Sequence, residues 1–227
     1  MCGIVGYVGE NSASPILIDG LKKLEYRGYD SAGIAVSENG KTDVVKTKGR
    51  IKNLEEKLEE VGGLSGTVGI GHTRWATHGA PTDVNAHPHK GGNGRITLVH
   101  NGIIENYIEL KTMLQKGGYV FVSETDTEVL AHLFDYYYKG DLLDAMVNVM
   151  KTVRGSYAVA ILADDKPGTI IAARKDSPLI VGLGDGENFL ASDIPAVLKY
   201  TRDCYLLEDN QIAVLTKDNV TLYDTDK

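Results

Sequence analysis

The sequence predicts an α+β fold in which two mainly antiparallel β-sheets are stacked face to face with helices on the outside. Three observations lead to this prediction. Short apolar runs are numerous, and several are apolar on both faces, as strands covered on both sides must be. Most of these runs are joined by short turns. Helical segments fall between sets of strands, which differs from the strict alternation of a parallel doubly wound sheet.

The predicted strands are rich in β-branched and other apolar residues and are bounded by turn-forming residues. In chain order they are residues 2–8, 31–37, 43–49, 67–73, 95–101, 156–163, 169–174, 179–184, 204–208, 211–216 and 219–224.

The predicted helices are recognised by apolar residues that recur every three or four positions. Such a stripe is clear in residues 51–61 and again in residues 127–138. Three further helices are expected at residues 14–25, 103–116 and 141–153.

Composition narrows the class of protein. The chain has 227 residues, 42% of them hydrophobic and 24% charged, as expected for one soluble globular domain over residues 1–227. A net charge of −7 argues against nucleic-acid and anionic-membrane partners, which require a basic surface. No apolar run approaches the length of about 20 residues that spans a bilayer. Only two cysteines occur and no signal peptide precedes Cys2, so we expect a cytoplasmic location.

The run MCGIVGYVG places a cysteine at position 2. Cys2 could simply pack as a small hydrophobic residue. Alternatively, removal of Met1 would leave Cys2 with both a thiol and an α-amine, so that one residue supplies the nucleophile and its base. Position alone leaves both interpretations open.

The segment HTRWATHG (72–79) joins a strand to a long irregular loop, residues 77–95. The planar guanidinium of Arg74 could bind a carboxylate through two hydrogen bonds, or form a surface salt bridge. Trp75 could belong to the core. Adjacent arginine and tryptophan at such a junction nevertheless favour a ligand site, because turns prefer other residue types.

Two further segments carry polar groups that could act on a ligand. In VHNGIIEN (99–106), Asn101 and Gly102 are expected to end a strand ahead of a helix, where their N–H groups could stabilise an oxyanion; a hairpin turn is the alternative. In SETDTE (123–128), Asp126 could cap the following helix or bind an ammonium group. Arg74 and Asp126 together would suit an α-amino acid.

Other signals are weaker. The histidines lack the spacing of a zinc site, GLGDG (182–186) is best explained by a hairpin turn, and no phosphate-binding loop is present. We therefore expect no metal and no cofactor. Cys204 is expected to be structural.

Six segments can be taken together: CGIVG, LEYRGYDSAG (24–33), HTRWATHG, NAHPH (85–89), VHNGIIEN and SETDTE. In this order they resemble the glutaminase domains of glucosamine-6-phosphate synthases, within the class II glutamine amidotransferases. The resemblance covers nearly the whole chain. It implies the N-terminal-nucleophile hydrolase fold, an αββα four-layer sandwich.

The resemblance also implies the roles of individual residues. Cys2 would attack the side-chain amide of L-glutamine and form a glutamyl thioester, with its α-amine moving the protons. Asn101 and Gly102 would hold the oxyanion, Arg74 the substrate carboxylate and Asp126 its amino group. Trp75, Thr77 and His78 match a loop that covers glutamine, and Arg27 matches a supporting position near the nucleophile.

The partners implied are L-glutamine and a sugar-phosphate isomerase portion of the same polypeptide, which nothing in these 227 residues resembles. The whole enzyme would be a homo-oligomer that transfers ammonia to fructose 6-phosphate. Two alternatives stay open: the glutaminase half of another class II amidotransferase, such as amidophosphoribosyltransferase or asparagine synthetase, and a non-catalytic amino-acid-binding module.

Overall fold

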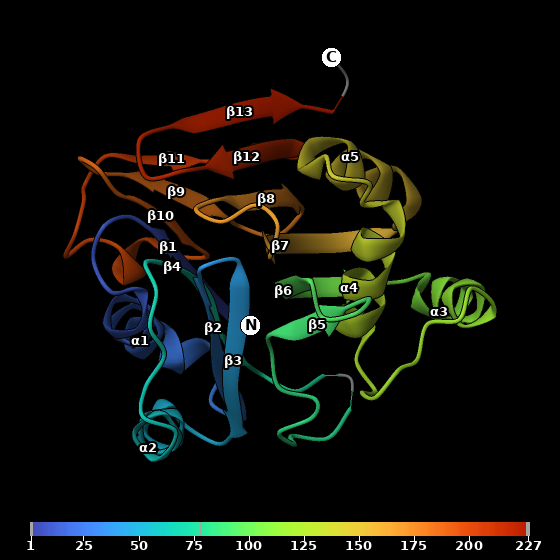
Figure 1. The fold of residues 1–227 in the computed structure, drawn as a ribbon, viewed down its shortest axis with the longest axis horizontal. Helices are drawn as coiled ribbons and strands as arrows, with labels where there is room; N and C mark the ends of the chain where they lie inside the picture. Colours follow the sequence, from blue (N-terminus) through green and yellow to red (C-terminus); the bar gives the residue numbers. More distant parts are fainter. Residues whose placement is uncertain (1, 78, 226–227) are drawn as a thin grey trace.

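The fold has four layers, helices, sheet, sheet and helices, as Figure 1 shows. It was analysed in a computed structural model that describes residues 2–77 and 79–225. Neighbouring strands are antiparallel throughout both sheets. The predicted fold class is confirmed.

The first sheet has seven strands in the order β11-β9-β10-β1-β4-β2-β3. Their bounds are β1 Gly3–Val8, β2 Ser31–Glu38, β3 Lys41–Lys48, β4 Val68–Arg74, β9 Ile180–Leu183, β10 Asn188–Ala191 and β11 Cys204–Leu206. The second sheet has six strands in the order β13-β12-β8-β7-β6-β5. Their bounds are β5 His89–Gly91, β6 Ile96–Ile104, β7 Gly155–Ala163, β8 Ile170–Lys175, β12 Gln211–Leu215 and β13 Val220–Asp224.

Helices cover the outer face of each sheet. α1 (Ala13–Leu24) and α2 (Ile51–Glu60) lie against the first sheet, on the left of Figure 1. α3 (Tyr107–Lys116), α4 (Asp126–Tyr137) and α5 (Leu142–Thr152) lie on the right, beside the second sheet. Short 3-10 helices span Glu25–Arg27 and Ile194–Ala196.

Three apolar cores fill the spaces between the four layers. Strand β1 contributes to two of them, which explains why it is apolar on both faces. Ile4 and Val8 pack between the two sheets, whereas Val5 and Tyr7 pack against the helices of the first layer. Successive side chains of a strand point to opposite faces, so a strand between two covered faces needs apolar residues at every position.

Three sequence predictions differ from the structure. The helix predicted at 103–116 begins only at Tyr107, because β6 continues through Ile103 and Ile104, which pair with Ser156 and Gly155 of β7. The irregular loop 77–95 contains the short strand β5. Strand β10 was not predicted, although the hairpin at GLGDG is confirmed by the antiparallel pairing of β9 with β10.

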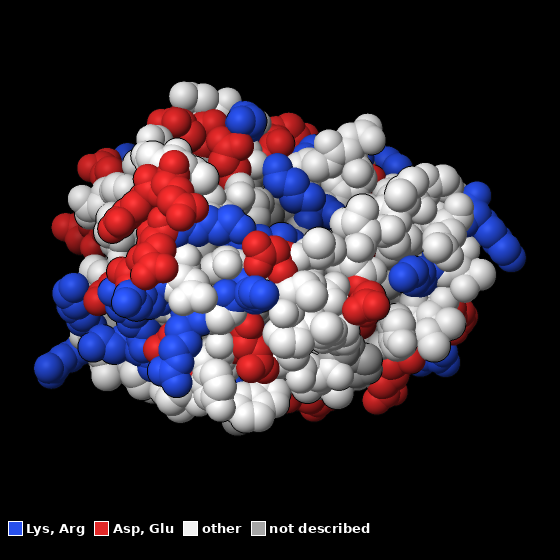
Figure 2. All heavy atoms as spheres, turned by 90° about the horizontal axis from the view of Figure 1, so that it is seen from below, with Lys and Arg blue, Asp and Glu red and all other residues white. Residues whose placement is uncertain are grey.

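The surface carries charges of both signs. Figure 2 shows one face, on which acidic side chains gather at one end and basic side chains lie beside them. Within residues 2–77 and 79–225, no helix is both long enough and apolar enough to cross a membrane.

Candidate active site

Cys2 lies immediately before β1, near the centre of the first sheet, where β1 pairs with the end of β4. The backbone N–H of Trp75 donates to Cys2 Sγ at 3.2 Å, and the thiol points to the Trp75 carbonyl at 3.6 Å. Burial raises the pKa of the Cys2 thiol, and the Trp75 N–H and the positive charge of Arg74 oppose that shift. The thiol is therefore anchored to the strand end that carries Arg74.

Arg74 and Asp126 place opposite charges in the pocket that contains Cys2. The pocket is lined by Cys2, Arg74, Trp75, Thr77, His87, His100, Gly102, Thr125, Asp126 and Thr127. Arg74 is only 4% exposed, so it is not the surface residue of the alternative interpretation, and burial lowers its pKa. Its guanidinium donates to the carbonyls of Gly79, at 3.2 Å, and Ala80, at 3.4 Å. The pocket thus holds one side chain that could bind a carboxylate and one that could bind an ammonium group.

Asp126 is the first residue of α4, but it does not cap the helix. The cap is Thr125, whose hydroxyl accepts a hydrogen bond from the Glu128 N–H. Asp126 Oδ2 instead accepts the backbone N–H of Ile104 at 2.9 Å, which ties α4 to the end of β6. The capping interpretation of Asp126 was wrong, and its carboxylate is left beside the pocket.

Asn101 and Gly102 lie within β6, so the expectation that they end a strand, and the alternative of a hairpin turn, were both wrong. Gly102 has φ +126°, and a Cβ there would lie 2.1 Å from the Ser156 carbonyl oxygen. Only glycine fits this position. Asn101 Nδ2 donates to the carbonyl of Cys2 at 3.0 Å, which places the amide next to the nucleophile candidate.

A second hollow adjoins the first and shares Cys2, Trp75, Thr77 and Gly102 with it. Arg27 lines this second hollow, where Asp193 binds its guanidinium at 2.5 Å. Trp75 is 45% exposed and packs edge-on against Tyr29, so it is not a core residue. The predictions for Met1 and His78 lie outside the described residues.

The structure also brings residues to the site that the sequence analysis did not select. Asp30 Oδ2 accepts the N–H of Ala76 at 2.9 Å, and the Asp30 N–H donates to the Arg74 carbonyl. In the lining of the pocket, His100 Nδ1 donates to or accepts from the Thr127 hydroxyl at 3.0 Å. Asp30 lies in LEYRGYDSAG and His100 in VHNGIIEN, so the quoted segments contained both residues. Their contacts could not be predicted, because each joins segments distant in the sequence.

A stack of buried histidines borders the site, with His72 against His87 and His87 against His89 at ring distances of 4.1 and 4.9 Å. Burial lowers the pKa of all three rings. In the described part of the chain, no group of three or more His, Cys, Asp or Glu side chains could hold a metal ion.

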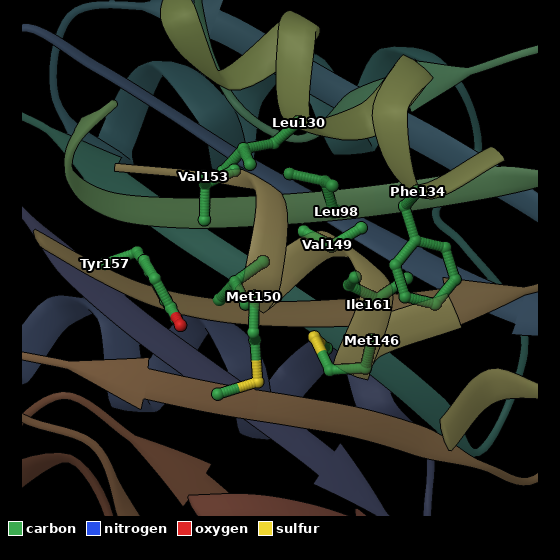
Figure 3. Close-up of a pocket in the computed structure, with 10 residues that line it drawn as sticks. Leu98, Leu130, Phe134, Met146, Val149, Met150, Val153, Tyr157 and Ile161 are labelled. Carbon is green, nitrogen blue, oxygen red and sulfur yellow. The ribbon is translucent and has the colours of Figure 1, made fainter. Parts of the chain in front are cut away.

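A separate apolar pocket lies between α4, α5 and the second sheet, as Figure 3 shows. Its lining includes Leu130, Phe134 and Met146 and contains no charged side chain. The one hydroxyl among the lining residues belongs to Tyr157, and burial raises its pKa to about 12, so the pocket holds no group that is ionised at neutral pH. Cys204, the other cysteine of the chain, is not part of the site. It is exposed on edge strand β11 and lines neither of the two hollows at Cys2.

The two stacked antiparallel sheets, with Cys2 at the start of a central strand, have the fold of the class II amidotransferases. The structure is similar to that of glutamine phosphoribosylpyrophosphate amidotransferase from B. subtilis, with a TM-score of 0.85 and 27% identity. That match covers 99% of this chain and 49% of the other.

The chain belongs to the glutamine amidotransferase family: the family described as a glutamine amidotransferase domain matches residues 72–199. Two relatives are glutamine–fructose-6-phosphate aminotransferases (isomerizing). The one from Clostridium tetani is 61% identical over 224 residues, 99% of this chain, and the one from Clostridium perfringens is 60% identical over 227 residues, 100% of this chain. The chain spans 37% of the length of each of these relatives.

Proposed function

We propose that the chain is a glutaminase that hydrolyses the side-chain amide of L-glutamine to glutamate and ammonia, with Cys2 as the nucleophile. The observation that carries this proposal is the placement of the Cys2 thiol in one pocket with the guanidinium of Arg74 and the carboxylate of Asp126. Arg74 would bind the α-carboxylate of glutamine and Asp126 its α-ammonium group, which leaves the side-chain amide to reach Cys2.

The reaction proceeds in two steps. Cys2 Sγ bonds to the amide carbon of glutamine, the carbon–nitrogen bond breaks, and ammonia leaves with the thiol proton. Water then hydrolyses the γ-glutamyl thioester to glutamate and restores the thiol. Once Met1 has been removed, the α-amine of Cys2 accepts the thiol proton and passes it to the leaving nitrogen. A raised thiol pKa makes such a base necessary at neutral pH.

Asn101 Nδ2 and the backbone N–H of Gly102 are proposed to stabilise the oxyanion of the tetrahedral intermediate. Asn101 has two amide protons, one of which is donated to the Cys2 carbonyl, so the other is available for the oxyanion. The segment with Trp75, Thr77 and His78 is proposed to cover the bound glutamine. Arg27 is proposed to support the site from the second hollow.

We further propose that residues 1–227 act as one domain of a longer, cytoplasmic and homo-oligomeric protein. In that protein the ammonia would convert fructose 6-phosphate to glucosamine 6-phosphate in a sugar-phosphate isomerase portion. The relatives named as aminotransferases of this kind support the proposal, since each is 37% matched by this chain.

An electrophilic analogue of glutamine tests the assignment of the nucleophile. Intact mass and peptide mapping are expected to find Met1 removed and one label on Cys2, and L-glutamine should slow the labelling. Cys2→Ala should bind glutamine but lose glutamate production by at least about 10⁴-fold.

The matched control is Cys204→Ala, which removes the other thiol and lies far from the pocket on an edge strand. It should be labelled and should hydrolyse glutamine like the unchanged protein. A label on Cys204, or undiminished glutamate production by Cys2→Ala, would refute the proposed function.

A further inference from the structure

His72 is a buried histidine of β4 whose ring contacts the side-chain amide of Asn101, the group proposed to stabilise the oxyanion. Its Nε2 lies 2.9 Å from Asn101 Oδ1 and 3.0 Å from the backbone carbonyl oxygen of His100. The contact therefore crosses from β4 in the first sheet to β6 in the second. No step of the proposed hydrolysis uses this ring.

The two contacts fix which nitrogen of His72 carries the proton. A backbone carbonyl oxygen can only accept a hydrogen bond, so Nε2 must be the donor toward His100. Burial lowers the pKa of His72 to about 3, so the ring is neutral at physiological pH and Nε2 holds its one proton. Nδ1 is a buried acceptor without a hydrogen-bond partner in the described part of the chain.

The same proton fixes the orientation of the Asn101 amide. Nε2–H requires an acceptor at 2.9 Å, which is Oδ1, and this turns Nδ2 toward the Cys2 carbonyl at 3.0 Å. A rotated amide would set donor against donor at His72 and acceptor against acceptor at Cys2. The terminal torsion of asparagine is otherwise broad and nearly two-fold, so the amide needs these anchors.

We propose that His72 is a positioning residue for hydrolysis: its Nε2–H holds Asn101 Oδ1 so that Nδ2 faces the oxyanion formed at Cys2. The inference rests on the proposed function of the site. His72 itself touches neither the substrate nor the reacting atoms. It lowers the barrier only through Asn101, by presenting a preorganised donor to the developing charge.

His72→Phe tests this inference, because phenylalanine fills similar space but has no donor. We expect kcat for glutamine hydrolysis to fall on the order of 10- to 100-fold with little change in KM, less than a complete loss of the Asn101 donor would cause. His72→Gln, whose amide nitrogen can occupy the place of Nε2, should recover most of kcat. The matched control is His132→Phe on α4, another buried histidine that touches no residue of the site and should leave kcat unchanged.

Two measurements separate positioning from a general loss of structure. The γ-aldehyde of glutamate forms a tetrahedral adduct with the thiol, so its affinity should fall by the same factor as kcat, while the affinity for glutamate stays constant. In an Asn101→Ala background, His72→Phe should have no further effect on kcat. Equal losses for aldehyde and glutamate, or a full additional loss in the double variant, would overturn the inference.

A third measurement needs no variant. Nitrogen-15 NMR of the histidine side chains should find His72 protonated on Nε2. The ring should not titrate between about pH 5 and pH 8, the range in which a free histidine with a pKa of roughly 6.5 would do so. Protonation on Nδ1 would contradict the inference. An unchanged protein that makes no glutamate would remove the proposed function and this inference with it, whereas an active protein with an equally active His72→Phe variant overturns the inference alone.

Discussion

Helix α4 contributes to two pockets of opposite character. Its first residues, Asp126 and Thr127, line the polar pocket at Cys2. Leu130 and Phe134, farther along the helix, line the apolar pocket of Figure 3. Asp126 and Leu130 are four residues apart, a rise of about 6 Å along an α-helix.

One helix can thus use different residues for packing and for the proposed chemistry. The apolar residues fix where α4 lies against the second sheet, because their burial is favourable in only one orientation. The first turn then carries a carboxylate whose position depends on that packing and on the N–H of Ile104. Changes at the two ends of α4 should therefore affect stability and activity separately.

Phe134→Ala should produce the largest loss of stability. Phe134 is fully buried and stacks on Tyr138, so truncation should lower the free energy of unfolding by about 3–5 kcal/mol. Urea denaturation measures this loss, and KM for glutamine should be unchanged at a temperature where the variant is folded. A raised KM without a loss of stability would break the proposed separation.

Glu128→Gln should have a smaller, pH-dependent effect. Burial raises the pKa of Glu128, but His132 and hydrogen bonds from Ser123 and Val122 outweigh it and hold the pKa at about 2. Since this pKa is lower than in the unfolded chain, Glu128 stabilises the fold above about pH 4.5 and loses that contribution as pH falls toward 2. The difference in unfolding free energy between the two proteins should be about 3 kcal/mol at pH 7 and should shrink below pH 4.5. A difference independent of pH would contradict this account.

Arg74→Lys should have the smallest effect and sharpen the comparison at the polar end. An ammonium group keeps the charge but cannot donate two parallel hydrogen bonds to a carboxylate. We expect KM for glutamine to rise about 10-fold, with stability little changed. Steady-state kinetics gives this value, and an unaltered KM would mean that Arg74 does not bind the substrate.

The layered fold could be predicted because it depends on local patterns. Strand β1 is buried at every position, β7 is buried from Tyr157 to Ala163, and α2 has a clear apolar stripe. The start of α3 could not be predicted, since Ile103 and Ile104 suit a helix stripe and a strand equally well. Their pairing with β7, a contact between distant segments, decides for the strand.

The residues of the candidate site could be selected from the sequence, but their contacts could not. SETDTE offers several capping residues, and only the position of the Ile104 N–H explains why Thr125 caps α4 while Asp126 faces the pocket. The amide orientation of Asn101 likewise depends on His72, 29 positions earlier. Such pairings follow from the stacking of two sheets, which no local pattern encodes.

The central place of β1 has a consequence for synthesis on the ribosome. β1 ends at Val8, yet its neighbour β10 begins at Asn188, and Val8 pairs with Asn188 itself. At a synthesis rate of about 5–20 residues per second, the intervening chain of roughly 180 residues takes on the order of 10–40 s to make. One edge of β1 therefore waits unpaired while most of the domain is translated. The residues that line the pocket at Cys2 are all made by Thr127, so the ribosome supplies the partners of the thiol before it supplies the second neighbour of the strand that follows it.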